Sequence, residues 1–354
     1  MHWCARKVVV LCAILALAIP AFAARGTVVE VTVHGSSLEG NLSGTSPDRT
    51  VAIYLPADYT QDTAVRYPVL YLINGNIGDN RTWLDIWNVD EAADTLIASG
   101  AIQPLIIVMP DARNAYPANL YVNSPVTGNW EDFIANDLIG YVDTHYRTIA
   151  GPEDRAIAGH GMGGFGALSI ATKHPETFRV VYAMSPWPIG MQETEFSMLS
   201  PFDFLVAAAA VSSEAPPSAY PELAAMAAFL SPNPDKPPGY IDLPYERVDN
   251  QPHRIDAVWN EWLAHTPLAM IRAHANDLRR YNGIAFDVGT LDTEDMLIDT
   301  QAYSEALTRA GIPHRFDVFA GGHLDRVKAR LQAVVLPYVS QKLAAPGPQG
   351  ASAQ

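Results

Sequence analysis

The sequence predicts an α/β fold with a mostly parallel central sheet flanked by helices. Apolar runs alternate with stretches of helical periodicity along most of the 354 residues, which is the pattern of repeated βαβ units. In addition, residues 67–73 and 104–110 are continuous apolar runs, as expected of central strands that are covered on both faces. With 49% hydrophobic residues, the chain suits one large domain or one domain with a sizeable insertion.

Residues 1–23 are expected to be a secretory signal peptide. A basic start precedes an apolar run, and residues 21–23 (AFA) have the small-x-small pattern of a cleavage site. The apolar run is short for a membrane span, and no later segment reaches the required length. Both cysteines, Cys4 and Cys12, lie in this segment, so no disulfide is expected once it is removed. The expected location is therefore secreted or periplasmic.

The regular elements of the domain at 24–343 follow in order. Residues 27–33 and 50–56 alternate between apolar and polar positions, which is typical of partly exposed strands. The later strands are expected at 67–73, 104–110, 156–158, 178–185, 283–289 and 314–319. The helices are expected at 89–100, 130–145, from 165 onward, at 294–311 and at 324–343. Residues 344–354 are small, polar and rich in Pro and Gly, which predicts a disordered tail.

Residues 186–282 break this alternation. They contain two stretches dense in proline between short helical pieces. So long a connection is usually functional, and it predicts a cap-like insertion over the active-site end of the sheet. Four aromatic residues there are candidates for an aromatic or acyl-binding groove, or for a small core of the insertion itself: Trp187, Tyr240, Trp259 and Trp262.

The stretch RAIAGHGMGGFGAL, from Arg155 to Leu168, has the context of a nucleophile elbow. A buried strand, a tight glycine-rich turn and a helix follow one another, as around the serine of a G-x-S-x-G motif. The middle position of this turn, however, is Gly161. Because glycine has no hydroxyl group, no acyl-enzyme can form at this position.

Two further loops with reactive side chains are expected at the carboxyl ends of strands, where open α/β sheets bind ligands. The loop GTLDTED carries Asp292 and Asp295, and the loop AGGHLD carries His323. The chain order elbow, acid, histidine is that of a hydrolase triad. Asp292 is the first candidate for the acid and Asp295 the alternative. Asp295 and Asp299 are otherwise expected as N-terminal and exposed positions of the next helix.

With these motifs the chain resembles the secreted esterase family of α/β hydrolases. That family includes feruloyl and acetyl-xylan-type esterases, S-formylglutathione hydrolase, enterochelin-type esterases and the mycobacterial antigen 85 acyltransferases. The resemblance covers about residues 31–343 and rests on VAIYLPADY with YPVLYLINGN, on AGHGMGGFGAL with KHPETF, on GTLD and on GGH. It implies an α/β-hydrolase fold with the insertion placed before the acid loop.

The resemblance also implies roles for individual residues. Asp292 would orient His323, which would act as general base. The oxyanion donors would be the backbone N–H of Met162 and an N–H near Asn76. His160, in the elbow, would pack beside the site as the family's equivalent histidine does. Together with Trp187, one of the insertion aromatics named above, it is the candidate for substrate binding. The chain departs from the family at Gly161 and at Asn74, where a histidine is common in the family.

Four hypotheses address the missing serine. In the first, His323 and Asp292 activate a water molecule that hydrolyses a carboxylic ester or related acyl compound. In the second, the protein is a non-catalytic pseudo-hydrolase that binds a ligand or the cell envelope. In the third, Ser185 replaces the nucleophile, although a serine that caps a turn is the simpler interpretation. In the fourth, the glycine was introduced to trap a substrate.

Composition limits the remaining partners. The formal charge of −15 and the lack of a basic run argue against nucleic acid and anionic membranes. No H-E-x-x-H motif or close His/Asp cluster indicates a metal, and the chemistry implied by the resemblance needs no organic cofactor. The expected partner is a small-molecule ester or acyl substrate. The oligomeric state is left open.

Overall fold

The computed structural model describes residues 25–75, 78–191, 201, 203, 221–343 and 347–348. The predicted signal peptide and Asn76 therefore lie outside the described residues. Of the predicted tail, Gly347–Pro348 (β14) is described, and it pairs antiparallel with β3, Val65–Arg66. None of the helices in these ranges is long and apolar enough to cross a membrane.

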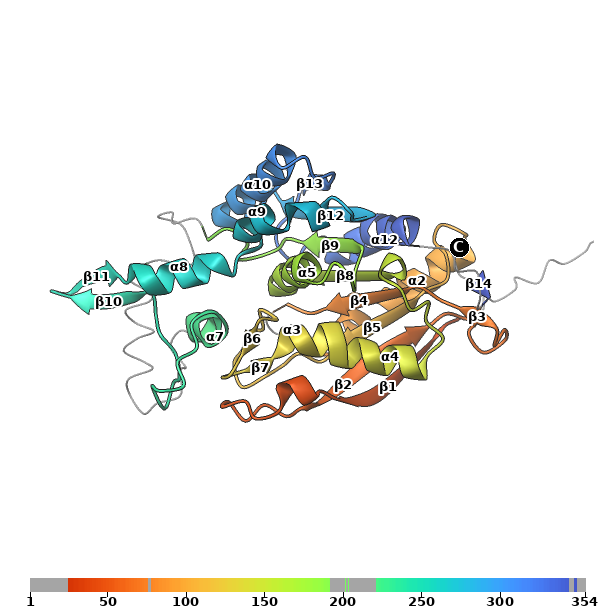
Figure 1. The fold of residues 1–354 in the computed structure, drawn as a ribbon. Helices are drawn as coiled ribbons and strands as arrows, with labels where there is room; N and C mark the ends of the chain where they lie inside the picture. The colour runs from red at the N-terminus through yellow and green to blue at the C-terminus, as the bar shows by residue number, and fades with distance from the viewer. Residues whose placement is uncertain are drawn as a thin grey trace, which may run out of the picture.

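An eight-stranded sheet forms the centre of the molecule, with the strand order β1-β2-β5-β4-β8-β9-β12-β13 (Figure 1). Its strands are β1 Thr27–His34, β2 Asp48–Leu55, β4 Val69–Ile73, β5 Ile106–Pro110, β8 Arg155–His160, β9 Val180–Met184, β12 Gly283–Gly289 and β13 Arg315–Phe319. The pairs β1–β2 and β2–β5 are antiparallel, and all other neighbouring pairs are parallel. The predicted mostly parallel sheet is thus confirmed.

Burial explains why the central strands are apolar runs. Every residue of β4, β5, β8, β9 and β12 is buried, because helices cover both faces of the sheet there. Successive side chains of one strand enter opposite layers: Tyr71 packs in one core cluster and Leu72 in the other. Strand β1, at the edge, keeps the alternating pattern of a partly exposed strand.

Two helical layers enclose the sheet (Figure 1). One layer consists of α1 Thr82–Asp85, α2 Val89–Ala98, α11 Val327–Arg330, η4 Leu331–Val335 and α12 Leu336–Lys342. The other consists of α3 Trp130–Asp132, η2 Phe133–Leu138, α4 Ile139–His145, α5 Met162–Lys173, α9 Pro267–Leu278 and α10 Glu294–Arg309. The smaller elements are η1 Ser36–Leu38, η3 Pro152–Asp154, β6 Asn123–Ser124 and β7 Gly128–Asn129.

The predicted insertion at 186–282 contains a hairpin and three helices in its described part. They are α7 Pro221–Leu230, β10 Tyr245–Val248, β11 Gln251–Arg254, α8 Asp256–Ala264 and α9. In Figure 1 the hairpin, α7 and α8 extend to the left of the sheet, away from α12. Its aromatic residues pack inward. Trp262 is fully buried and donates its Nε1–H to Ser231 Oγ at 2.7 Å, and Trp259 packs edge-on against Tyr245.

Three of the differences from the sequence prediction have a clear physical reason. Helix α5 begins at Met162, three residues before the expected start, because the left-handed turn at Gly161 leads directly into it. Helix α1 was not expected, since its four residues are too few to show a helical period. The β10–β11 hairpin was not expected either, because it directly follows a proline-rich stretch and its short strands show no sustained alternation of apolar and polar residues.

Candidate active site

The turn at Gly161 has the backbone geometry of a strained strand-to-helix turn. Its φ and ψ are 59° and −120°, a conformation that residues with a side chain rarely adopt. The turn is held on both sides: the Gly161 N–H donates to Met184 O at 3.0 Å, and Gly161 O accepts from the N–H groups of Phe165 and Trp187 at 3.0 and 3.1 Å. The end of β8 and the start of α5 are therefore fixed relative to each other.

Two flanking glycines are required by close backbone approach. A Cβ added at Gly159 would lie 2.2 Å from Gly163 O, and one added at Gly163 would lie 2.5 Å from Asn74 O. No side chain fits at such distances, so α5 can approach the ends of β8 and β4 this closely only with glycine. The N-terminus of α5 is thereby placed next to the loop that follows β4.

Gly161 faces His323. An ideal Cβ at Gly161 would lie 3.2 Å from His323 Nε2 and 3.6 Å from His323 Cε1. Outside the turn itself, no other described atom lies within 4 Å of that position. The side chain that a serine would carry here would therefore point at the imidazole and into otherwise open space.

Asp292 is the carboxylate that faces His323. Its Oδ1 lies 3.4 Å from His323 Nδ1, and neither atom has a hydrogen-bond partner elsewhere in the described part of the chain. Its Oδ2 accepts from Ser185 Oγ at 2.7 Å and from the Gly289 N–H at 2.8 Å. Burial opposes ionisation, but the contact with His323 and these two hydrogen bonds outweigh it and lower the pKa of Asp292.

Ser185 supports the acid and does not face the imidazole as a nucleophile would. It follows β9 with a φ of 39°, and its N–H donates to Asp287 O at 2.9 Å. Its hydroxyl donates to Asp292. A nucleophile would have to meet His323 at hydrogen-bond distance instead. The sequence hypothesis of a replacement nucleophile thus finds no geometry to support it, and Ser185 orients Asp292.

Asp295 and Asp299 are not exposed helix positions, which corrects the sequence-based expectation. Both are buried in α10 because the segment that leaves β9 packs over the first turns of this helix. Asp295 Oδ2 accepts the Nε1–H of Trp187 at 3.1 Å. Asp299 Oδ2 accepts the N–H groups of Gly190 and Met191 at 3.0 and 2.7 Å. These two acids fix the start of the insertion, and of the three candidate carboxylates Asp292 is the one that contacts the imidazole.

His160 lies beneath His323. The two rings are 4.3 Å apart between centroids, and His160 Nε2 is 2.8 Å from the backbone oxygen of His323. Burial, with the charge of His323 as a second cause, lowers the pKa of His160 to about 4. A neutral His160 can donate its Nε2–H to that carbonyl and so hold the loop that carries His323.

Replacing His160 by glutamine is expected to flatten the pH dependence of stability. In the wild type the unfolded chain takes up a proton near pH 6.5 and the folded chain only near pH 4. The contribution of a neutral, buried His160 to the free energy of unfolding should therefore be fully present above pH 6.5. It should decrease by about 3 kcal/mol as the pH falls from 6.5 to 4. Urea unfolding at several pH values measures this. The exposed His145, changed to glutamine, is the control, and an unchanged slope in H160Q would contradict the assignment.

The oxyanion donors are described in part. Met162 is the first residue of the 12-residue helix α5, and the first N–H groups of a helix have no acceptor within it. Asn74, at the position where a histidine is common, is buried and donates its amide to Asp79 O at 2.6 Å. Its side chain thus stabilises the loop after β4. The second predicted donor, near Asn76, lies outside the described residues.

A cavity of about 610 Å³ opens at this point. It is lined by Asn74, Gly75, Gly78, Thr82, Trp83, Ile86, Trp87, His160, Gly161, Met162, Trp187, Leu291, Asp292, Thr293, Met296, His323 and Leu324. Trp187 lies in its wall, whereas the other three insertion aromatics are not among its lining residues. The sequence does not predict the part of the wall that α1 and the residues after it contribute. Apolar side chains that line a cavity show the same sequence pattern as those that pack in a core.

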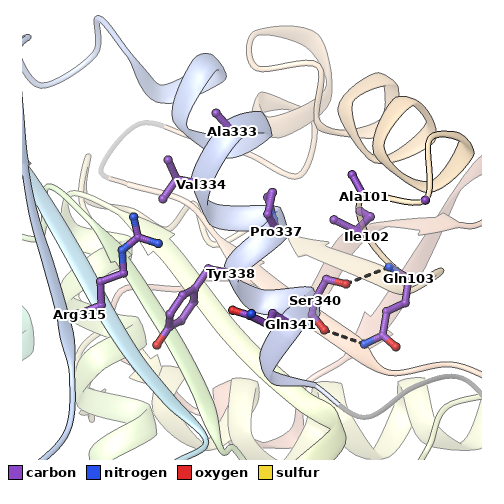
Figure 2. Close-up of a pocket in the computed structure, with 11 residues that line it drawn as sticks. Ala101, Ile102, Gln103, Arg315, Ala333, Val334, Pro337, Tyr338, Ser340 and Gln341 are labelled. Carbon is purple, nitrogen blue, oxygen red and sulfur yellow. Dashed lines mark hydrogen bonds between the residues drawn. The ribbon is translucent and has the colours of Figure 1, made fainter.

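A second cavity, of about 620 Å³, lies elsewhere (Figure 2). Gln103, shortly before β5, and Arg315, at the start of β13, place it at the amino ends of strands, opposite to the elbow. Its polar groups already have partners: Gln103 donates to Ser340 Oγ and Ser340 O, both at 2.9 Å (Figure 2). Arg315 pairs with Asp317, which lies outside the lining of the cavity. The imidazole and carboxylate of His323 and Asp292 therefore lie at the cavity beside Gly161, not at this second cavity. The described residues also contain no cluster of His, Cys, Asp and Glu suited to a metal.

The chain is similar in sequence to curated esterases. An esterase of Mycobacterium tuberculosis is 28% identical over 281 residues, which are 78% of this chain and 52% of that protein. An endo-1,4-beta-xylanase/feruloyl esterase of Xylanibacter ruminicola is 32% identical over 160 residues, which are 43% of this chain and 20% of that protein. The chain thus spans about half the length of the mycobacterial relative and less of the other.

The chain is also similar to solved structures and to one family model. The superposition on a ferulic acid esterase covers 90% of this chain and 99% of that esterase chain, with a TM-score of 0.64 and 23% sequence identity. The superposition on the S-formylglutathione hydrolase of Agrobacterium tumefaciens covers 91% of this chain and 97% of that chain, with a TM-score of 0.59 and 16% sequence identity. These likenesses confirm the α/β-hydrolase fold. A family model described as "Putative esterase" matches residues 43–327. The chain therefore belongs to the esterase family of α/β hydrolases.

Proposed function

We propose that this protein hydrolyses a carboxylic ester with a water molecule in place of the serine nucleophile. The observation that carries the proposal is the 3.2 Å distance between His323 Nε2 and the Cβ position of Gly161. A water oxygen beside Gly161 would lie within reach of the imidazole, where a serine hydroxyl would otherwise be. Membership of the esterase family supports ester hydrolysis in general, and the names of feruloyl and ferulic acid esterases among its relatives suggest aryl-substituted acyl groups.

The reaction needs one water and no covalent intermediate. His323 Nε2 takes a proton from the water as its oxygen attacks the ester carbonyl carbon. The N–H of Met162 stabilises the developing oxyanion, and Asp292 stabilises the imidazolium. Collapse of the intermediate breaks the bond to the alcohol oxygen, which receives the proton from His323. The products are one carboxylic acid and one alcohol. We further propose that this occurs outside the cytoplasm, which rests on the sequence of residues 1–23.

A second candidate function is ligand binding without catalysis. The apolar cavity favours it, because a cavity of this kind holds a ligand whether or not a nucleophile is present. Loss of the triad serine also removes most of the rate enhancement of a serine hydrolase and leaves about 10³–10⁴-fold over water from the oxyanion hole and binding. The two functions share one site and differ in whether His323 acts as a base.

Replacing His323 by alanine separates these functions. We expect the wild type to hydrolyse p-nitrophenyl acetate above the buffer blank without a burst, and H323A to lose at least about 100-fold in kcat/KM, the share of a general base. H145A, at an exposed histidine of α4, should leave kcat/KM unchanged. A wild type that does not exceed the blank would favour the binding function. Hydrolysis that survives in H323A would show that the site is assigned wrongly.

A further inference from the structure

We propose that the cavity binds an apolar monocarboxylic acid, with its carboxylate between His323 Nε2 and the N-terminus of α5. The proposal rests on the site of the proposed function and names the ligand that this site retains. A serine hydroxyl would fill the place between Gly161 and the imidazole. In this chain that place can receive an oxygen atom of the ligand itself, because the Cβ position of Gly161 is open except toward His323.

The head group of the site matches a carboxylate. One carboxylate oxygen would lie beside Gly161 and accept the Nε2–H of a protonated His323. The other would accept the N–H of Met162 at the start of α5, where the helix dipole also favours negative charge. An ester or amide presents only one oxygen acceptor of comparable strength at this point. The site therefore prefers the free acid over its neutral derivatives.

The charges around the cavity limit the ligand to one carboxylate. Asp292 already contacts the other ring nitrogen of His323, so the imidazolium would lie between two carboxylates. No Lys or Arg is among the described residues that line the cavity. A second acidic group on the ligand would therefore be buried without a partner, which is costly.

The wall of the cavity matches an apolar body. Trp83, Trp87 and Met296 line it, and its mouth carries Ile86, Leu291 and Leu324. These three side chains are 58%, 76% and 57% exposed. They are half of the large hydrophobic residues that the described surface exposes, so their grouping at one cavity marks a binding surface rather than chance. Its volume of about 610 Å³ lies in the usual range for small-molecule sites.

The test compares three ligands on the wild type by calorimetry and tryptophan fluorescence. Octanoate has both the carboxylate and an apolar body, octanamide lacks the charge, and acetate lacks the body. Because Trp83, Trp87 and Trp187 line the cavity, their fluorescence should report binding. We expect saturable binding of octanoate and at least about tenfold weaker binding of octanamide and of acetate. Equal affinity for octanoate and octanamide would overturn the carboxylate site.

Two variants and a matched control locate the site. G161A adds a Cβ in the place assigned to a carboxylate oxygen, and H323A removes its donor, so each should weaken octanoate binding at least about tenfold. G311A is the control, because Gly311 also has a positive φ, of 64°, but open space around it. Octanoate affinity unchanged in both site variants would refute the proposal. Octanoate binding without ester turnover would refute only the proposed hydrolysis, and turnover without a preference for octanoate would refute only this inference.

Discussion

Replacing Gly161 by serine is expected to raise the hydrolysis of p-nitrophenyl acetate at least about 100-fold. The reason is that the elbow, the imidazole and its carboxylate already lie in the arrangement that a serine needs, and the triad as a unit contributes about 10⁶-fold in serine hydrolases. The Cβ of the new side chain points at His323 Nε2. Its Oγ should therefore lie within hydrogen-bond distance of the base and form an acyl-enzyme.

Local sterics set the limits of this gain. At 3.2 Å from Nε2, the Cβ is closer than an ordinary contact, so His323 must move by a few tenths of an ångström. The His323 side chain is 35% exposed and belongs to a loop, which allows such a shift. A serine at a φ of 59° also stores strain, and the variant should be less stable by about 1–3 kcal/mol.

The measurement is stopped-flow hydrolysis with excess substrate. G161S should release a burst of p-nitrophenol equal to the enzyme concentration, since p-nitrophenol leaves during acylation and we expect deacylation to be the slower step, whereas the wild type should show a linear trace. G161A carries the same backbone strain without a hydroxyl and should show no gain. If G161S also shows no gain while remaining folded, the arrangement of His323 and Asp292 is not competent for catalysis.

Most of the architecture could be predicted because it depends on local patterns. The continuous apolar runs at β4 and β5 follow directly from burial on both faces of the sheet. The glycines at 159 and 163 mark the close approach of strand and helix, which predicts the elbow even without a serine. The loops after β12 and β13 are neighbours because those strands are parallel and adjacent, so Asp292 and His323 meet.

The details that escaped prediction depend on tertiary contacts. The acids of α10 were expected in water, since nothing in their spacing shows that the segment from Trp187 to Met191 covers them. Ser185 was considered as a nucleophile, because its position at a strand end is visible in the sequence but the direction of its hydroxyl is not. The apolar mouth at Leu291 and Leu324 lies in loops, where periodicity carries no information about exposure.

Changing Asp292 to asparagine in the G161S background is expected to remove most of the activity gained. The carboxylate keeps His323 in the tautomer that presents a bare Nε2 to the serine, and it stabilises the imidazolium. The amide of asparagine replaces the carboxylate that accepts from Ser185 Oγ and the Gly289 N–H. Its NH₂ group can also donate to Nδ1, which favours the tautomer with the proton on Nε2. In triad hydrolases this change costs about 10⁴ in kcat, and we expect at least about 100-fold here.

Asp295 provides the matched control, because it is a buried aspartate of the same loop and helix start. In the same background its change to asparagine keeps an oxygen acceptor for Trp187 Nε1 and does not alter the contacts of His323, so kcat should stay near that of G161S.

A pH profile of kcat distinguishes the roles of Asp292 and Asp295. Because the pKa of Asp292 is lowered, this carboxylate stays ionised across the pH range of the assay, so G161S should exceed its Asp292 variant at every pH. A large loss of kcat in the Asp295 variant with no loss in the Asp292 variant would contradict the assignment of Asp292 as the triad acid and would give that role to Asp295.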